Sequence, residues 1–192
     1  NAKSIALTGG STPKRLYEIL GASLPQDITW VIVDERYVPK DDPQSNAAMI
    51  ERTLFANGVP ERWLPFRTEL DDPAVTARAF ESEWRELGIG DLDLVLLGCG
   101  DDGHTASLFP GTGALDVEDR IATEVYVPRL EQWRVTITKP VIRAAKQRIV
   151  MAAGASKAQI VADVRAGVQH PVTVVMEGVE TWWFVDREAA GK

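Results

Sequence analysis

The stretch Ile5-Ala-Leu-Thr-Gly-Gly-Ser-Thr-Pro13 passes from a short apolar segment through two glycines into a helix start. Short apolar runs of this kind are typical of buried parallel strands. Ser11 and Thr12 are residue types that cap helices, and Pro13 suits the first helical position. A strand, a tight turn and a helix in immediate succession predict the opening unit of an α/β fold.

Similar units follow along the chain. Asp72-Pro73 repeats the helix-start signal, and Phe80, Trp84 and Leu87 then share one helical face. Two serines are expected to cap further helices, Ser45 and Ser156. The other predicted strands are Thr29–Val33, Leu92–Leu97, Arg134–Thr138, Arg148–Ala153, Val172–Met176 and Trp182–Val185. This alternation predicts one α/β domain over residues 1–192, with a mostly parallel, Rossmann-like sheet flanked by helices.

The composition is that of a globular protein, because 45% of the 192 residues are hydrophobic and 26% are charged. The net charge of −7 argues against a nucleic-acid partner, and it means that an anionic ligand needs a local site. No apolar run has the roughly 18 residues that span a bilayer, so we expect no membrane partner. The single cysteine, Cys99, favours a reducing compartment, and we expect a cytoplasmic protein.

Three polar loops follow predicted strands, at the sheet edge where α/β proteins bind ligands. In the first, Gly9 and Gly10 allow a ligand close to the backbone. The next helix directs free N–H groups toward the loop, and Ser11 and Thr12 add hydroxyl donors. The loop is either a phosphate cradle or a plain turn with a helix cap, and these residues alone leave both interpretations open.

The second loop, Asp34-Glu35-Arg36, places three consecutive charges directly after an apolar strand. Packing does not readily explain such a run, although an exposed strand end would tolerate it. Asn46 lies one loop later and is expected to reach the same cleft. Arg36 is expected either to contact substrate oxygens or to pair with Asp34 or Glu35.

The third loop, Gly98-Cys-Gly-Asp-Asp-Gly-His-Thr105, matches a dinucleotide-binding fingerprint in its first six residues. We reject that interpretation because Asp101 and Asp102 would lie where a pyrophosphate must approach. Histidine is the side chain most easily poised near neutral pH, so His104 beside Asp102 is predicted to perform acid–base chemistry. No metal-ligand spacing accompanies these residues, and we expect no metal. His170 lacks a comparable setting and is predicted to be structural.

Two cations occupy similar positions relative to predicted strands. Arg134 opens an alternating strand, and Lys157 lies at another strand-to-helix turn. An isolated cation of this kind is usually solvated. Both are nevertheless expected at the same sheet edge as the glycine loop, where they would form a phosphate pocket within an acidic protein.

These segments, in this order and over essentially the whole chain, resemble the 6-phosphogluconolactonase family, which is related to glucosamine-6-phosphate deaminase/isomerase. Arg36 and the Ser-Leu-Phe-Pro run over residues 107–110 favour the lactonase, because the deaminase typically has tyrosine at the first position and lacks the second feature. The family normally carries a further N-terminal strand and helix, which we do not find here. The segments that carry the resemblance are Leu7–Pro13, Val33–Pro39 with Ser45-Asn46, Leu97–Gly111, Arg134–Thr138, Gly154–Lys157 and Trp183–Asp186.

The resemblance implies hydrolysis of 6-phospho-D-glucono-1,5-lactone to 6-phosphogluconate in the oxidative pentose phosphate pathway, without a cofactor. His104 is then expected to act as general base on a water molecule, with Asp102 orienting its ring. Backbone N–H groups of the glycine turn are expected to face the oxyanion. The expected substrate- and phosphate-binding residues are Gly9, Gly10, Ser11, Thr12, Asp34, Arg36, Asn46, Arg134 and Lys157.

Three other chemical roles compete with this one. Ser107 is a poor nucleophile candidate because it lacks the Gly-x-Ser-x-Gly setting. An aldose–ketose isomerase with deaminase activity would use Asp34 to abstract a proton and His104 to assist ring opening. A non-catalytic sugar-phosphate sensor would keep the phosphate-binding residues and need neither His104 nor Asp102.

Overall fold

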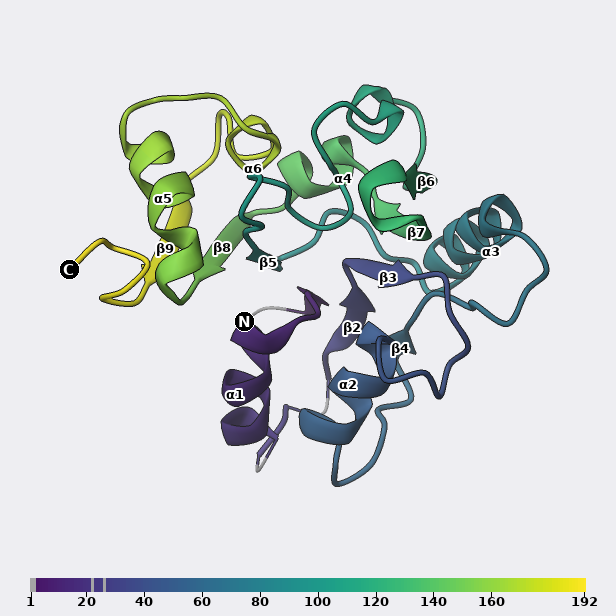
Figure 1. Ribbon diagram of the computed structural model, residues 1–192. Helices are drawn as coiled ribbons and strands as arrows, with labels where there is room; N and C mark the ends of the chain where they lie inside the picture. Colours follow the sequence, from purple (N-terminus) through teal and green to yellow (C-terminus); the bar gives the residue numbers. More distant parts are fainter. Residues whose placement is uncertain (1–2, 22, 26) are drawn as a thin grey trace.

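A six-stranded parallel sheet forms the centre of the computed structural model, which describes residues 3–21, 23–25 and 27–192 (Figure 1). Its strands lie in the order β4-β2-β1-β5-β8-β9, and every neighbouring pair is parallel. The predicted Rossmann-like α/β fold is therefore confirmed. The strands are β1 (Ser4–Leu7), β2 (Thr29–Ile32), β4 (Trp63–Leu64), β5 (Leu94–Gly98), β8 (Gln147–Ala152) and β9 (Thr181–Val185).

The strand order reverses at β1, which pairs with β2 on one side and with β5 on the other. In doubly wound sheets, such a switch point leaves a crevice beyond the carboxyl ends of the two strands, where ligands bind. The first and third polar loops follow β1 and β5 and therefore border this crevice.

A second, antiparallel sheet has the order β3-β7-β6, with β3 (Asp34–Arg36), β7 (Gln132–Ile137) and β6 (Ala122–Val127). Arg134–Thr138 was predicted among the strands of a largely parallel sheet, and its assignment to that sheet was wrong. The run pairs instead with β3 and β6. The sequence did not predict this pairing because buried apolar strands have the same sequence pattern in parallel and antiparallel sheets. Arg36 lies opposite Arg134 in this register, so the run Asp34–Arg36, which was predicted to be a loop, forms the strand β3 itself.

Two of the helices, α2 (Asn46–Thr53) and α3 (Pro73–Glu86), begin where a polar residue caps the first turn. Asp72 accepts hydrogen bonds from the Ala74 and Val75 N–H groups, and the Ser45 hydroxyl accepts one from Ala48, which confirms both predicted caps.

No helix in the described part of the chain is long and apolar enough to cross a membrane. The α-helices are α1 (Ser11–Leu20), α2 (Asn46–Thr53), α3 (Pro73–Glu86), α4 (Lys139–Ala144), α5 (Ala158–Arg165) and α6 (Pro171–Val174), and the 3₁₀ turns are η1 (Gly113–Asp116), η2 (Pro128–Leu130) and η3 (Ala155–Lys157).

Two predicted helix starts were wrong. Helix α1 already includes Ser11 and Thr12, and Gly10 occupies the N-cap position with a φ of 102°. Glycine adopts this positive φ without strain, so the helix begins at Ser11, two residues earlier than predicted. Ser156 lies inside η3, and Lys157 precedes α5 without a side-chain cap.

The predicted strand Val172–Met176 was also wrong, because Pro171–Val174 forms the short helix α6. Pro171 occupies the first turn, where the missing N–H of proline costs nothing. The Thr173 hydroxyl accepts a hydrogen bond from the His170 N–H, which closes the helix start. A short β-branched run does not distinguish a strand from a buried helical turn.

Candidate active site

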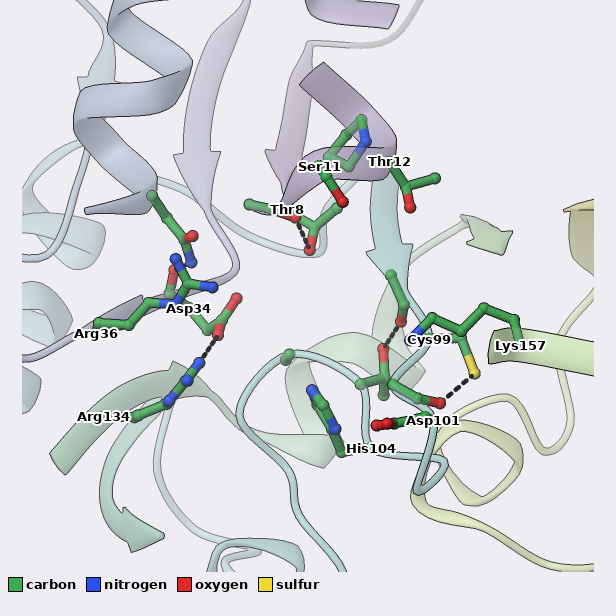
Figure 2. A pocket seen from close by; sticks show the side chains of 18 residues that line it. Thr8, Ser11, Thr12, Asp34, Arg36, Cys99, Asp101, His104, Arg134 and Lys157 are labelled. Carbon is green, nitrogen blue, oxygen red and sulfur yellow. Dashed lines mark hydrogen bonds and ion pairs between the residues drawn. The ribbon is translucent and has the colours of Figure 1, made fainter. Parts of the chain in front are cut away.

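A cavity of about 200 Å³ opens at the switch point between β1 and β5 (Figure 2). In this view Ser11 and Thr12 lie at the top and His104 at the bottom, with the opening between them. Asp102 does not line the cavity and contacts His104 instead. The predicted site residues that line it are Gly9, Gly10, Ser11, Thr12, Asp34, Arg36, Asn46, His104, Arg134 and Lys157.

The glycine loop places the N-terminus of α1 against the cavity. No side chain of the described residues caps this helix end, so its first N–H groups are available to an anion. The fully buried Tyr17 donates to the Thr8 carbonyl at 2.8 Å and ties the loop to its own helix. A Cβ atom at Gly9 would overlap the Asn46 amide, so glycine is required there for close packing.

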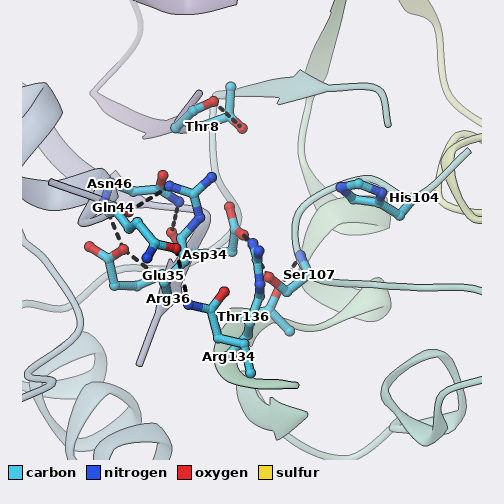
Figure 3. A network of polar contacts seen from close by, with 12 residues as sticks. Thr8, Asp34, Glu35, Arg36, Gln44, Asn46, His104, Ser107, Arg134 and Thr136 are labelled. Atoms are coloured by element: carbon cyan, nitrogen blue, oxygen red, sulfur yellow. Dashed lines mark hydrogen bonds and ion pairs between the residues drawn. The ribbon is translucent and has the colours of Figure 1, made fainter. Parts of the chain in front are cut away.

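Asp34 is buried and forms the polar centre of one cavity wall (Figure 3). Its Oδ2 accepts a hydrogen bond from the Ser107 hydroxyl at 2.6 Å and lies 4.0 Å from Arg134 Nη1. Asn46 Nδ2 donates to the Asp34 carbonyl at 2.9 Å. These contacts join the loop after β5, the antiparallel sheet and the start of α2 around one residue, Asp34.

Glu35 faces away from the cavity and stabilises the start of α2. Its carboxylate accepts hydrogen bonds from the Arg36, Asn46 and Ala47 N–H groups at 2.7–2.8 Å, and from the Ser45 hydroxyl at 3.1 Å. Burial raises its pKa, against the lowering effect of the backbone donors. The three consecutive charges thus divide between a structural anchor and two cavity residues.

Arg36 pairs with neither of its acidic neighbours, which excludes one of its two expected roles. Its Nη1 donates to the Gln44 carbonyl at 2.6 Å. Among the described residues, three buried atoms of cavity-lining side chains have no hydrogen-bond partner: Arg36 Nε, Asn46 Oδ1 and Arg134 Nε. Buried polar groups are normally paired, so these atoms favour a polar ligand or water.

His104 and Asp102 form a close pair. His104 Nδ1 lies 2.5 Å from Asp102 Oδ1, which also accepts the His104 backbone N–H at 3.1 Å. Burial lowers the His104 pKa below its usual 6.5, and the interaction with Asp102 opposes that effect only in part. Burial acts to raise the pKa of Asp102, but the hydrogen bonds from His104 and the charge of Arg129 outweigh it and leave that pKa lowered.

The backbone of this loop is largely engaged in its own hydrogen bonds. Gly100 N–H donates to the His104 carbonyl at 2.8 Å, and Gly103 N–H donates to the Gly100 carbonyl at 3.1 Å. The N–H groups of Gly100, Gly103 and His104 are therefore already bonded and are not available as the expected oxyanion donors. That sequence-based expectation is therefore wrong for these three N–H groups.

His170 supports the loop from outside the cavity, as expected for a structural histidine. A Cβ atom at Gly103, whose φ is 77°, would lie 2.7 Å from His170 Cβ. Val172 N–H donates to the Gly103 carbonyl at 3.0 Å, and His170 Nε2 lies 3.2 Å from Asp163 Oδ2.

Two contacts of the His104–Asp102 pair were not predicted from the sequence. The Phe109 ring stacks on the His104 imidazole at a centroid distance of 4.0 Å. Arg129 Nη2 donates to Asp102 Oδ2 at 2.6 Å. Phe109 lies within the segment Leu97–Gly111, so the sequence offered a signal for it. Arg129 lies in none of the segments that carry the family resemblance. Within the described residues, no cluster of three His, Cys, Asp or Glu side chains is suited to a metal ion.

Comparisons with known proteins agree with this architecture. A family model described as glucosamine-6-phosphate isomerases/6-phosphogluconolactonase matches residues 1–183. A 6-phosphogluconolactonase of Synechocystis sp. is 39% identical over 97% of this chain and 82% of its own length. A crystal structure of 6-phosphogluconolactonase from Leishmania guyanensis superposes with a TM-score of 0.87 at 30% identity, over 99% of this chain and 86% of that one.

A monomeric glucosamine-6-phosphate deaminase has the same fold, with a TM-score of 0.84 at 24% identity over 98% of this chain and 87% of that one. The family match covers nearly the whole sequence, and the two lactonase relatives exceed or reach 30% identity. The chain belongs to the glucosamine-6-phosphate isomerase/6-phosphogluconolactonase family.

Proposed function

We propose that the protein hydrolyses 6-phospho-D-glucono-1,5-lactone to 6-phosphogluconate, with His104 as general base. The observation that carries this proposal is the cavity itself, with an uncapped helix N-terminus on one side and a half-buried His–Asp pair on the other. Relatives named 6-phosphogluconolactonase support the same activity.

The glycine loop and Lys157 bind the phosphate group in this proposal. The N-terminus of α1 carries partial positive charge, and the ammonium of Lys157 adds a full one beside it. This local site overcomes the repulsion expected from a net charge of −7. Binding at the phosphate orients the lactone carbonyl at the other end of the cavity.

His104 takes a proton from water, and the resulting hydroxide equivalent attacks the lactone carbonyl carbon. Asp102 stabilises the imidazolium that forms. The tetrahedral intermediate collapses as the C1–ring-oxygen bond breaks, and the departing oxygen receives the proton held by His104. The products are a carboxylic acid, which ionises, and a free hydroxyl, so atoms and charges balance.

Arg134 is assigned to the oxyanion in place of the phosphate. Its guanidinium carbon lies 5.5 Å from the centre of the Phe109 ring, which itself stacks on His104. The positive charge of Arg134 therefore lies at the end of the cavity where His104 acts. The buried Nε of Arg134 lacks a partner among the described residues. A preorganised cation of this kind stands in for the three N–H groups of the glycine turn that are already bonded.

Asp34 is poorly arranged to be the base that an isomerase requires. Ser107 donates to its Oδ2 and Arg134 lies beside the same oxygen, so one of the two carboxylate oxygens is already engaged by the protein. We therefore assign Asp34 to holding Arg134 and the loop after β5.

The test is lactone hydrolysis followed in parallel with ammonia release from glucosamine 6-phosphate. A blank without protein corrects for spontaneous lactone opening. We expect a large excess rate with the lactone and no ammonia. Ammonia release would favour the isomerase, and 6-phosphogluconate binding with a hydrolysis rate equal to the blank would favour the sensor.

A further inference from the structure

Arg129 contacts the Asp102–His104 pair from a separate element, η2, in the turn between β6 and β7. Its Nη2 donates to Asp102 Oδ2 at 2.6 Å, while Asp102 Oδ1 faces His104 Nδ1 at 2.5 Å. The two oxygens of one carboxylate are thus divided between a permanent cation and the imidazole.

The ring of Phe109 holds the same two groups by a second contact. The imidazole of His104 stacks on it at 4.0 Å with an interplanar angle of 24°. The guanidinium carbon of Arg129 lies 5.3 Å from the ring centre, within the range of a favourable cation–π contact. Arg129 is therefore held at two points, although half of its side chain is exposed.

Resting on the lactonase function proposed above, we propose that Arg129 is a positioning residue, which fixes the Asp102 carboxylate and limits how strongly it favours the protonated form of His104. A general base must be neutral when each turnover begins. The cation partly compensates the carboxylate charge and also repels an imidazolium directly. Arg129 thereby keeps His104 active at lower pH.

Other charged groups face His104 from several elements, and all of them are still present in a protein in which Arg129 is replaced. Asp102 lies on its own loop, Asp34 on β3 and Arg134 on β7. Three further charged side chains, Arg36, Asp101 and Lys157, line the same cavity. A difference between the native protein and an Arg129 variant therefore reports on Arg129 itself.

The experiment follows the His104 titration by proton NMR in the native protein and in Arg129→Gln. The chain has two histidines, and a His104→Asn spectrum assigns their signals. We expect the His104 midpoint to rise by about 0.2–0.7 pH units in Arg129→Gln, the size typical of coupling to an exposed charge. The acidic limb of kcat/KM moves in the same direction. Arg129→Lys keeps the charge and restores both midpoints in part.

Arg67→Gln is the matched control. The Arg67 side chain is 49% exposed, against 50% for Arg129, and it pairs with Glu69 and Glu83 away from the cavity. An unchanged His104 midpoint in Arg129→Gln, or an equal shift in Arg67→Gln, would overturn the proposal. The NMR titration needs no turnover, so it tests the role of Arg129 independently of the lactonase function. A native hydrolysis rate equal to the blank would show separately that the lactonase function fails.

Discussion

Replacing Gly9 with alanine tests whether the glycine loop and Asn46 are packed as closely as the structure indicates. The new methyl group would overlap the Asn46 amide. Asn46 is 3% exposed and has little space to move, and moving it breaks the 2.9 Å hydrogen bond to the Asp34 carbonyl. The substitution therefore both overfills a packed region and leaves a buried carbonyl without its donor.

The expected cost is about 1–6 kcal/mol in the free energy of unfolding. Overpacking costs ~1–3 kcal/mol, and an unsatisfied buried acceptor costs ~1–3 kcal/mol. The reduced entropy of the unfolded chain returns ~0.4–1 kcal/mol. Urea unfolding measures the difference, and Gly90→Ala is the control, because its Cβ would meet no atom within 4 Å and the residue has no positive φ.

A double-mutant cycle makes the test specific to the contact. In an Asn46→Ala background the clash is absent, so Gly9→Ala should cost less than ~1 kcal/mol there. If Gly9→Ala costs the same in both backgrounds, or behaves like Gly90→Ala in the native protein, the packing argument is refuted.

Three further predictions concern the loop after β5, the phosphate end and pH. Ser107→Ala removes a charge-assisted hydrogen bond to buried Asp34 and should lower the free energy of unfolding, measured in urea, by ~1.5–3 kcal/mol. The rate of lactone hydrolysis should stay within ~10-fold of the native rate. Complete loss of turnover in folded protein would instead favour a mechanism through an acyl-enzyme. Lys157→Ala should weaken 6-phosphogluconate binding by ~10–100-fold in calorimetry, and unchanged affinity would remove Lys157 from the phosphate site. Burial lowers the His104 pKa below its unfolded value of 6.5, so the unfolded chain binds the extra proton and stability falls as pH drops below about 6.5. In a series of urea midpoints measured against pH, His104→Asn should flatten this fall. An unaltered slope would contradict the burial argument.

Much of the parallel sheet and of the cavity could be predicted because their signals are local. A short apolar strand followed by glycines and a helix start identifies a ligand-binding loop, as it does at Gly9 and Gly10. Ten predicted side chains or glycines meet at one cavity, because the loops after β1 and β5 border the same switch point.

The remainder depended on contacts between residues distant in sequence. The antiparallel pairing of β3 with β7 follows from register, and no local pattern separates it from parallel pairing. Arg129 reaches Asp102 across 27 positions, and an arginine in a turn usually lies in solvent. Glu35 stands inside a charged run whose members look alike, but burial against the start of α2 gives it a structural role.

The most direct test of the account is the rate of lactone hydrolysis by His104→Asn, measured against a blank and together with its affinity for 6-phosphogluconate. Loss of a general base should reduce kcat by ~10²–10⁴-fold, while the phosphate site keeps the affinity within a few-fold of the native value. Native-like hydrolysis by this variant would contradict the central role assigned to His104.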